Sequence, residues 1–334
     1  MAQPGLDEVL SQLEQERGME QLRIFSGNAN LALSDRIASE LDVTLGKMLS
    51  SKFSDGEIRV QVLESARGND VFLIQPTCDP VNDNIMELCI MLDAFRRASA
   101  GRITVVMPYY GYARQDKKIK PREPVTARLI ADFISSAGAN RVVTLDLHAD
   151  QIQGFFDLPV DHLYGGPIIG DYLIKHGYLN SDIVVVSPDV AGVPRARALA
   201  EIVKAPIAII AKRRPEPNKV DIMEIIGDVS GKRCVMIDDI IDTGGSVVQG
   251  AEALINRGAT EVIAACTHAV FSGEATSRLN NSPLKQVIVT DTVQLGPEKM
   301  FEKLTILSVA PLLAEAIKRI HNDQSVSALF DNYR

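Results

Sequence analysis

The residues best placed to do chemistry lie in one stretch, Cys234–Gly250, which reads CVMIDDIIDTGGSVVQG. It opens with a short apolar run of the kind that forms a buried strand. Two adjacent carboxylates, Asp238 and Asp239, follow this run where the strand is expected to end. A helical pattern begins after Ser246, and Gly258 is a suitable C-terminal stop. The stretch therefore predicts a strand, an acidic and glycine-rich loop, and a helix.

The loop between strand and helix has the chemistry of a sugar-phosphate site. Glycine-rich backbone N–H groups and the partial positive charge of a helix N-terminus together favour a phosphate. Carboxylates would repel a bare phosphate, but they suit a ligand that also carries hydroxyl groups or a metal ion. The alternative is an ordinary turn in which Asp and Gly serve only the backbone geometry. The loop residues are Asp242, Thr243, Gly244, Gly245 and Ser246.

The segment DDIIDTGGS, Asp238–Ser246, resembles the phosphoribosyl-pyrophosphate loop of the type I phosphoribosyltransferase fold. In that fold the acidic pair holds the ribose hydroxyls and the Thr-Gly-Gly segment holds the 5-phosphate. The resemblance implies a type of ligand and does not yet imply a reaction.

Length and composition narrow the class of protein. A chain of 334 residues with 46% hydrophobic content suits two domains with proper cores. The net charge of −8 argues against a protein that mainly binds nucleic acid or an anionic membrane. The four cysteines are widely spaced in apolar contexts, which favours core packing in a reducing, cytoplasmic compartment. No apolar run approaches membrane-spanning length, and residues 1–21 read as a flexible extension without the features of a secretory signal.

From Leu22 onward, apolar runs alternate with helical stretches, which predicts parallel sheets covered on both faces. The predicted strands are Leu22–Phe25, Val71–Ile74, Ile103–Met107, Val142–Leu145, Ile183–Val186, Ile207–Ile210, Val235–Ile237, Val262–Ala265 and Val287–Val289. The clearest predicted helices are Asn84–Arg97, Arg128–Ser136 and Pro194–Ile202.

An internal repeat indicates two related α/β domains in tandem. Gly138–His148 reads GANRVVTLDLH and Gly258–His268 reads GATEVIAACTH, and each follows an amphipathic helix. Chance similarity of two helix–strand units is the alternative. The predicted division is an extension at 1–21, a first domain at 22–161, a second domain at 162–307, and a C-terminal helix and tail at 308–334.

The first repeat carries a cationic loop where the second carries its acidic one. Tyr109–Pro124 reads YYGYARQDKKIKPREP. Its cations are Arg114, Lys117, Lys118, Lys120 and Arg122. A polyphosphate is the natural counterpart of such a loop, although a solvated charge run is the common alternative. Neither a Walker loop nor a GxGxxG motif occurs in the chain, so a bound nucleotide would depend on dispersed cations.

Three further segments carry residues suited to the same site. His148 and Asp189 each stand at the expected carboxyl end of a strand, which is the ligand edge of a parallel sheet, and Asp189 is a candidate metal ligand. Lys212, Arg213 and Arg214 follow another predicted strand and could close over phosphate charge. For these cations the alternative is a solubilising loop.

Nearly the whole chain from Leu22 resembles the ribose-phosphate diphosphokinase (phosphoribosyl-pyrophosphate synthetase) family. The matching segments are FSDGEIRV, ESARGNDVFLIQ, YYGYARQDKK, DLHADQIQGFF, VVSPDVAG, AKRRPEPN, VMIDDIIDTGGS, FSGEA and AEAIKRI…SVSALF. The resemblance implies two tandem phosphoribosyltransferase-like domains and transfer of the diphosphoryl group of ATP to the 1-hydroxyl of ribose 5-phosphate, with Mg²⁺ and release of AMP.

The resemblance also implies a role for each matching residue. ATP would be held by Arg114, Gln115 and His148, with adenine contacted by Phe53, Asp55 and Glu57 of a neighbouring subunit. His148 and Asp189 would serve the metal, and Lys212 and Arg214 would act from a catalytic loop. Asp238, Asp239, Asp242, Thr243, Gly244, Gly245 and Ser246 would hold ribose 5-phosphate. The family is typically hexameric, and Ser65, Arg67, Ser325, Ser327 and Phe330 would match its allosteric site for phosphate or ADP.

Some alternatives stay open at this point. Glu216 stands where relatives often carry a basic residue, and Phe53–Glu57 also reads as a hairpin turn. A phosphoribosyltransferase would use the same acidic loop but needs only one such domain. An inactive regulatory paralogue would lose the cations that this chain retains, and a regulator of nucleic acid would need a further DNA-binding domain.

Overall fold

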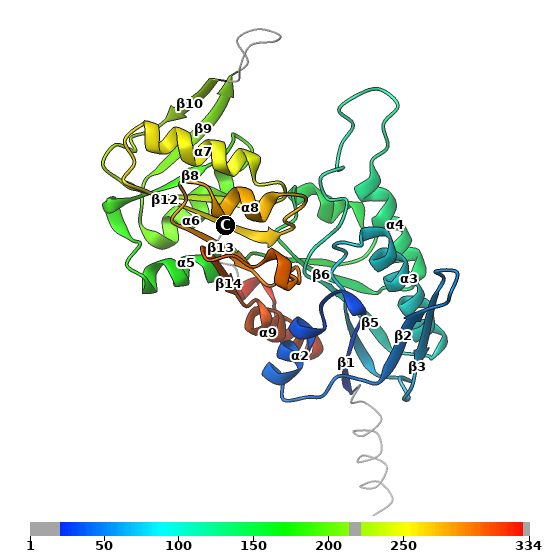
Figure 1. Cartoon of the computed structure of the whole chain (residues 1–334). Coiled ribbons are helices and arrows are strands. Elements are labelled where there is room, and N and C mark those ends of the chain that lie inside the picture. Colours follow the sequence, from blue (N-terminus) through cyan, green and yellow to red (C-terminus); the bar gives the residue numbers. More distant parts are fainter. Residues whose placement is uncertain (1–20, 214–221, 330–334) are drawn as a thin grey trace, which may run out of the picture.

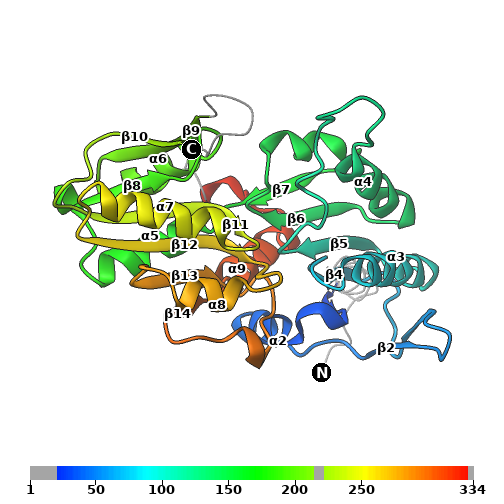
Figure 2. The same ribbon diagram turned by 45° about the horizontal axis from the view of Figure 1, so that its top comes forward.

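The computed structural model describes residues 21–213 and 222–329. The predicted N-terminal extension lies outside these residues except for its last position, and Arg214, Glu216 and Phe330 also lie outside them. The described chain forms two parallel sheets, each covered by helices, that lie side by side (Figures 1 and 2). The predicted fold class, two tandem α/β units, is confirmed.

The first sheet has five strands in the order β1-β4-β5-β6-β7, and all four neighbouring pairs are parallel. The strands are β1 (Leu22–Ser26), β4 (Asp70–Ile74), β5 (Arg102–Met107), β6 (Arg141–Leu145) and β7 (Val160–Leu163). The β4 strand is buried along its whole length, as expected for a central parallel strand with helices on both faces.

Helices cover both faces of this sheet. One face packs against α3 (Val81–Arg97) and α4 (Thr126–Ala137), and the other packs against α2 (Leu31–Glu40) and α9 (Ala310–His321). The α4 helix buries Ala127, Ile130, Ala131 and Ile134, which recur at the spacing of one helical face. The C-terminal helix therefore returns to complete the core of the first unit.

The second sheet has seven strands in the order β10-β9-β8-β11-β12-β13-β14, and only β10 is antiparallel to its neighbour. The strands are β8 (Ile183–Ser187), β9 (Ile207–Arg213), β10 (Ile222–Ile226), β11 (Arg233–Ile241), β12 (Glu261–Ala269), β13 (Gln286–Thr290) and β14 (Leu304–Leu307). One face packs against α5 (Gly166–Lys175) and α6 (Val193–Val203), and the other against α7 (Gly245–Asn256) and α8 (Ala275–Asn280).

The nine predicted strands are all present, and five strands were not predicted. Two of these, β2 (Met48–Lys52) and β3 (Ile58–Val62), form a separate antiparallel hairpin against α3. The other three, β7, β10 and β14, lie at sheet edges. Edge strands and hairpins are half exposed, so they lack the continuous apolar run that marks a buried strand. The predicted helix stop at Gly258 is confirmed. The α7 helix ends at Asn256, and Gly258, two residues later, has a φ of +95°, which is not helical.

Three of the predicted strands, which correspond to β9, β11 and β12, end three or four residues too early. The β11 strand continues to Ile241, so Asp238 and Asp239 lie within it. The β9 strand continues to Arg213 because β10 pairs with it, so Lys212 lies on a strand opposite Met223. In each case polar residues continue a strand that tertiary pairing stabilises. β7 pairs with β6 as part of the first sheet, so Asp161, the expected end of the first domain, lies within this strand.

The two sheets meet where β6 and β12 end. Oγ1 of Thr267 donates to the buried Asp146 carboxylate at 2.5 Å, and Nε2 of His268 lies 3.2 Å from the carbonyl oxygen of Leu145. The ring of Tyr109 packs edge-on against that of His268, with centroids 5.1 Å apart. These strands belong to the two copies of the sequence repeat, so the repeat places equivalent strand ends against each other.

Within residues 21–213 and 222–329, the helices are all too short or too polar to traverse a lipid bilayer. All four cysteines are unpaired in the structure.

Removing the Asp70 carboxylate should detach the C-terminal helix from the first sheet. Asp70 is fully buried at the start of β4 and accepts from Arg102 at 2.8 and 2.6 Å and from His321 of α9 at 2.8 Å. Breaking a buried ion pair costs about 3–5 kcal/mol, and the lower end applies because Arg102 and His321, the two partners of Asp70, are partly exposed. Asp70→Ala should therefore lower the free energy of unfolding by about 3 kcal/mol in urea titrations.

Asp93→Ala is the matched control, since Asp93 pairs with Arg96 and Arg97 on the exposed surface of α3. Equal losses in the two variants would show that the Asp70 cluster does not hold α9 in place.

Candidate functional site

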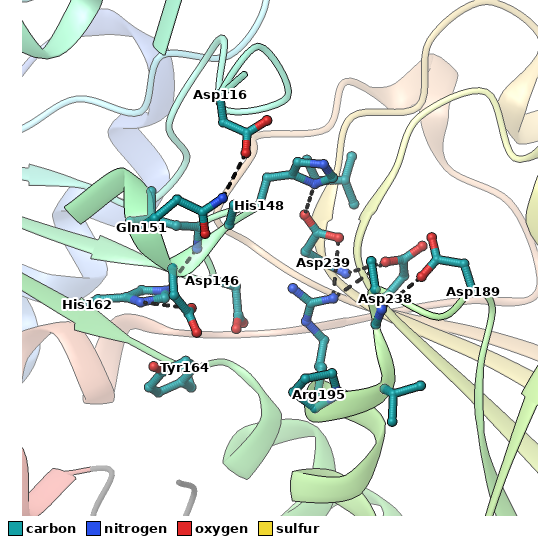
Figure 3. Close-up of a pocket in the computed structure, with 18 of the residues that line it drawn as sticks. Asp116, Asp146, His148, Gln151, His162, Tyr164, Asp189, Arg195, Asp238 and Asp239 are labelled. Atoms are coloured by element: carbon teal, nitrogen blue, oxygen red, sulfur yellow. Dashed lines mark hydrogen bonds and ion pairs between the residues drawn. The ribbon is translucent and has the colours of Figure 1, made fainter. Parts of the chain in front are cut away.

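A large cleft lies between the two units. Its volume is about 1010 Å³, and it is lined by the carboxyl ends of β6, β8 and β11, by the start of α6 and by the cationic loop. Figure 3 shows His148 and Gln151 on one side, with Arg195, Asp238 and Asp239 on the other. Ligands of open parallel sheets bind beyond the carboxyl ends of the strands, so this is the expected place for a site.

The acidic pair reaches this cleft because β11 extends past the end of its neighbour β8. Pairing of β11 with β8 ends at Met236, whereas pairing with β12 continues to Ile241. The last part of β11 therefore has no strand on its β8 side. Asp238 and Asp239 lie in this part of β11, which has a strand on one side only, and they line the cleft.

Two cations meet the acidic pair. Nδ1 of His148 lies 2.8 Å from Oδ2 of Asp239, across the cleft from the first unit. Nη1 of Arg195, from the first turn of α6, lies 3.4 Å from Asp239 and 3.6 Å from Asp238. The structure thus brings together three of the candidate residues, His148, Asp238 and Asp239, and it adds Arg195.

These contacts shift the pKa values of the two carboxyl groups in opposite directions. Burial and the adjacent charge of Asp239 raise the pKa of Asp238 well above its ordinary value. Burial would also raise the pKa of Asp239, but His148, Arg195 and Asp238 together lower it. The hydrogen bond to Asp239 raises the pKa of His148. The two carboxyl groups are therefore not equivalent, because Asp239 loses its proton more readily than Asp238.

The loop after β11 forms a compact cradle at the start of α7. Gly244 has a φ of +72°, which favours glycine, and it precedes a helix that no side chain caps. A methyl group at Gly245 would meet nothing closer than 3.8 Å, so there is open space above the first turn. Arg278 donates to the carbonyl oxygen of Thr243 and braces the loop from α8. This arrangement fits a phosphate at a helix N-terminus.

Asp242 connects the cradle to the cationic loop. Its Oδ2 accepts from Nη1 of Arg114 at 2.6 Å, which joins the loops of the two repeats. Its Oδ1 is buried and has no hydrogen-bond partner among the described residues. A buried acceptor without a partner is costly, so this oxygen is suited to a ligand hydroxyl group.

Arg114 also lines a second hollow of about 510 Å³ beside the cleft. Gln115 lies in the same hollow, and its Oε1 accepts from Thr126 at 2.6 Å. The remaining lining comes from Asp79–Asp83, Tyr109, Gly111 and Tyr112. Because Arg114 is common to both hollows, one extended ligand could occupy them together.

Asp189 lines the cleft but does not contact His148 in the structure. Its Oδ1 accepts from the N–H of Gly192 at 2.8 Å. Nowhere in the described part of the chain do three carboxylate, histidine or cysteine side chains gather as metal ligands. The arrangement therefore differs from a dedicated metal site built wholly from protein groups.

The remaining predicted residues lie away from this cleft. Phe53, Asp55 and Glu57 form the turn of the β2–β3 hairpin, where the N–H of Phe53 donates to the carbonyl of Glu57, and the Phe53 side chain is 51% exposed. Ser65 and Arg67 lie on the exposed loop before β4, and Ser325 and Ser327 follow α9. Lys212 is placed only by its backbone.

Sequence reasoning missed Arg195 and Asp146, which line the cleft, and His268, which contacts the Asp146 backbone from outside it. Arg195 follows the predicted Asp189 within the segment PDVAGVPRAR, and its position in the first turn of a helix was the available signal. Asp146 and His268 each lie in the repeat, but their contact with one another depends on how the two units meet.

The pKa of His148 should depend on Asp239. A histidine whose pKa is raised stabilises the folded state fully below its ordinary pKa of about 6.5, and this contribution is lost as the pH rises through the raised value. In ring-proton NMR titrations, the midpoint of His148 should lie above the ordinary value and should fall in Asp239→Asn.

His148→Gln assigns the signal among the five histidines, and the exposed His176 serves as a reference remote from Asp239. An identical midpoint for His148 with and without the Asp239 charge would contradict the ion pair.

Comparison with known proteins gives one consistent result. A model of the N-terminal domain of ribose phosphate pyrophosphokinase matches residues 22–138, and a model of the phosphoribosyl synthetase-associated domain matches residues 187–331. The chain is 56% identical to the ribose-phosphate pyrophosphokinase of Clostridium acetobutylicum, over 92% of this chain and 97% of that one. It is 54% identical to the ribose-phosphate pyrophosphokinase of Bacillus subtilis, over 95% of this chain and 100% of that one.

A solved structure agrees with these relatives. The crystal structure of phosphoribosylpyrophosphate synthetase from Mycobacterium smegmatis matches with a TM-score of 0.86 and 44% identity, covering 91% of this chain and 99% of that one. The two-unit fold, the cleft and the similarity to these relatives over nearly the full length of the chain all lead to the same assignment. The chain belongs to the ribose-phosphate pyrophosphokinase family.

Proposed function

We propose that this enzyme transfers the β,γ-diphosphoryl group of ATP to the 1-hydroxyl of D-ribose 5-phosphate. The products would be 5-phospho-α-D-ribose 1-diphosphate, which supplies nucleotide, histidine and tryptophan biosynthesis, and AMP. One observation carries the proposal: the acidic cradle and the cationic loop line the same cleft and touch through Arg114 and Asp242. The family of the chain supports the same reaction.

The acceptor sugar would occupy the second unit. Its 5-phosphate would receive the backbone N–H groups at the start of α7, over Gly244 and Gly245, with the hydroxyls of Thr243 and Ser246 beside it. Its ring hydroxyls would face Asp238, Asp239 and the unpartnered oxygen of Asp242. The two aspartates of the pair would then play different parts, since Asp239 holds its negative charge more readily than Asp238 and is the stronger acceptor for a ring hydroxyl.

The nucleotide would lie along Arg114 and Gln115, with its phosphates directed into the cleft. We assign Asp189 and His148 to the metal–nucleotide end, as the family resemblance implies. Mg²⁺ is commonly held by one or two carboxylates together with substrate phosphates and water, so a lone carboxylate such as Asp189 fits an ion that arrives with ATP. The ion would neutralise charge on the transferring group. Nε2 of His148 has no partner in the described residues and remains available on that side.

Cations would stabilise the transition state. In-line phosphoryl transfer needs positioning and charge stabilisation more than covalent chemistry. The β9–β10 ribbon extends beyond the rest of the second sheet and carries Lys212 near its end (Figure 1). We propose that Lys212 of this ribbon and Arg214, two residues later in the sequence, are the catalytic cations, as the resemblance implies. We also propose a division of the chain near residue 164, after β7, in place of the boundary at Asp161.

Assembly and regulation extend the proposal. All four cysteines are unpaired, which supports a reducing, cytoplasmic setting. We propose a homohexamer in which Phe53, Asp55 and Glu57 contact adenine in a neighbouring subunit, because their hairpin turn is exposed and does not line the cleft of its own chain. We further propose that ADP or phosphate binds at Ser65, Arg67, Ser325, Ser327 and Phe330. The first four lie near the amino ends of the first sheet, away from the cleft, since β4 and α9 meet there through Asp70.

The direct test is to incubate the protein with ATP, ribose 5-phosphate and Mg²⁺ and to quantify AMP. One AMP per sugar consumed is expected, and formation of ADP in place of AMP would contradict the proposal. A phosphoribosyltransferase is the alternative that shares the acidic loop. It would instead release diphosphate when a nucleobase and phosphoribosyl diphosphate are supplied.

Changes in the cradle should weaken the binding of the sugar phosphate without unfolding the protein. Asp242→Asn and Thr243→Ala each remove a group that would meet the ligand. A hydrogen bond to a charged group contributes about 1.5–3 kcal/mol, which corresponds to roughly a 10- to 100-fold rise in Kd for each change. Calorimetric titration with ribose 5-phosphate measures this directly.

Asp228→Asn, an exposed position before β11, is the matched control. If all three variants bind the sugar phosphate as tightly as the unaltered protein, the cradle is not its site.

Mixed subunits should recover activity that neither parent has. One inactive variant carries Phe53→Ala and Glu57→Ala, and the other carries Lys212→Ala. After the two are unfolded and refolded together in equal amounts, a complete site needs an intact hairpin turn from one chain and an intact Lys212 from its neighbour. Each condition holds half the time, so about a quarter of the sites should recover in a symmetric assembly. Each variant refolded alone is the control, and a mixture as inactive as these would show that the hairpin serves its own chain.

A further inference from the structure

The turn that carries His148 into the cleft is strained. Asp146 directly follows β6 and has a φ of +34°, in the left-handed region that a residue with a side chain rarely adopts. His148 comes two residues later and reaches Asp239 at 2.8 Å. A backbone in this region persists only where surrounding contacts hold it, and such residues cluster at functional sites.

Four hydrogen bonds hold Asp146 in place. Its N–H donates to the carbonyl of Leu163 at 2.9 Å, and its buried Oδ2 accepts from the N–H of Gly165 at 2.8 Å. The other two bonds come from β12 in the second sheet. Oγ1 of Thr267 donates to the same Oδ2, and Nε2 of His268 lies 3.2 Å from the carbonyl oxygen of Asp146 and equally far from that of Leu145.

The protonation of His268 follows from its surroundings. Its side chain is buried, and burial lowers its pKa, so the ring is neutral at pH 7. Carbonyl oxygens can only accept, so the ring proton must be on Nε2. Nδ1 then carries no proton and lies 2.9 Å from the hydroxyl oxygen of Thr292, whose one proton can go either to Nδ1 or to the carbonyl oxygen of Thr267 at 3.0 Å. The carbonyl groups of Leu145 and Asp146 are thus what favours the tautomer in which His268 donates to the turn.

We propose that His268 is a positioning residue of the active site, which fixes the strained Asp146 turn so that His148 meets Asp239. His268 itself does not line the cleft, so it would not touch either substrate. It acts across the junction of the two sheets: a residue of the unit that carries the sugar-phosphate cradle sets the position of a residue on the nucleotide side. This inference rests on the proposed function for its kinetic consequence, while its structural consequence can be measured without turnover.

The test compares two substitutions of similar size. His268→Gln keeps an N–H donor at the end of the side chain, and His268→Met removes it. In His268→Met, kcat should fall on the order of 10- to 100-fold because small misplacements of catalytic groups are costly. The KM for ribose 5-phosphate should stay within about twofold, since the cradle is untouched. His268→Gln should retain most of the activity. His176→Gln, which changes an exposed histidine directly after α5, should match the unaltered enzyme.

Amide hydrogen exchange gives a readout that does not depend on turnover. The N–H of Leu147 donates to the buried Nε2 of His162 at 2.9 Å, so its protection reports the shape of the turn. Exchange at Leu147 should accelerate in His268→Met but not in His268→Gln, while exchange at Val143 within β6 stays unchanged. An unaltered kcat in His268→Met would overturn the proposal. So would equal losses of kcat in both substitutions with uniform acceleration of exchange, because that pattern indicates general destabilisation. If the unaltered enzyme forms no AMP, the proposed function fails, and the exchange pattern still decides this inference.

Discussion

The cleft lies where the two sheets meet, and one buried carboxylate, that of Asp146, bonds to both sheets at this junction. Asp146 ends β6 in the first sheet, and its Oδ2 accepts from Thr267 on β12 in the second. Both strands point their carboxyl ends at this junction, and those ends are where parallel sheets carry their ligand-binding loops. The loops of the two repeats are therefore directed into the same space. If either sheet were rotated about this contact, Arg114 would part from Asp242 and His148 from Asp239.

Electrostatic complementarity follows from the same junction. The first repeat contributes Arg114 and His148, and the second contributes Asp242 and Asp239. An acidic loop alone would repel a phosphate ester, and a cationic loop alone would not distinguish a sugar from an inorganic anion. Placed opposite each other, they offer acceptors for hydroxyl groups and donors for phosphates within one cleft. Groups fixed before the substrates arrive need little reorganisation during reaction, and this is the main contribution that a protein makes to phosphoryl transfer. Divergence of one repeated unit into two loops of opposite charge is sufficient to account for a site with two substrates.

Much of this could be predicted from the sequence, because its strongest signals are local. Buried parallel strands read as continuous apolar runs. The positions of nine strands along the chain, and of Asp238 and Asp239 near the end of one of them, could therefore be predicted. The exact strand ends were not, because pairing with β12 extends β11 past its apolar part. Arg195 and His268 were missed for a related reason. Their roles depend on contacts between segments far apart in the sequence, and a single histidine in a strand gives no sign of the carbonyl groups it will meet. The strained φ at Asp146 likewise arises from tertiary contacts that no local pattern records.

The central claim is that the sugar phosphate and the nucleotide bind on opposite units and meet in the cleft. The most direct measurement is a crystal structure with ribose 5-phosphate, Mg²⁺ and an ATP analogue whose α,β-bridging oxygen is replaced by a methylene group. The account predicts the 5-phosphate over Gly244 and Gly245, the nucleotide along Arg114 and Gln115, and the 1-hydroxyl of the sugar facing the β-phosphorus. A sugar phosphate bound away from the α7 cradle, or a nucleotide confined to the second unit, would contradict it.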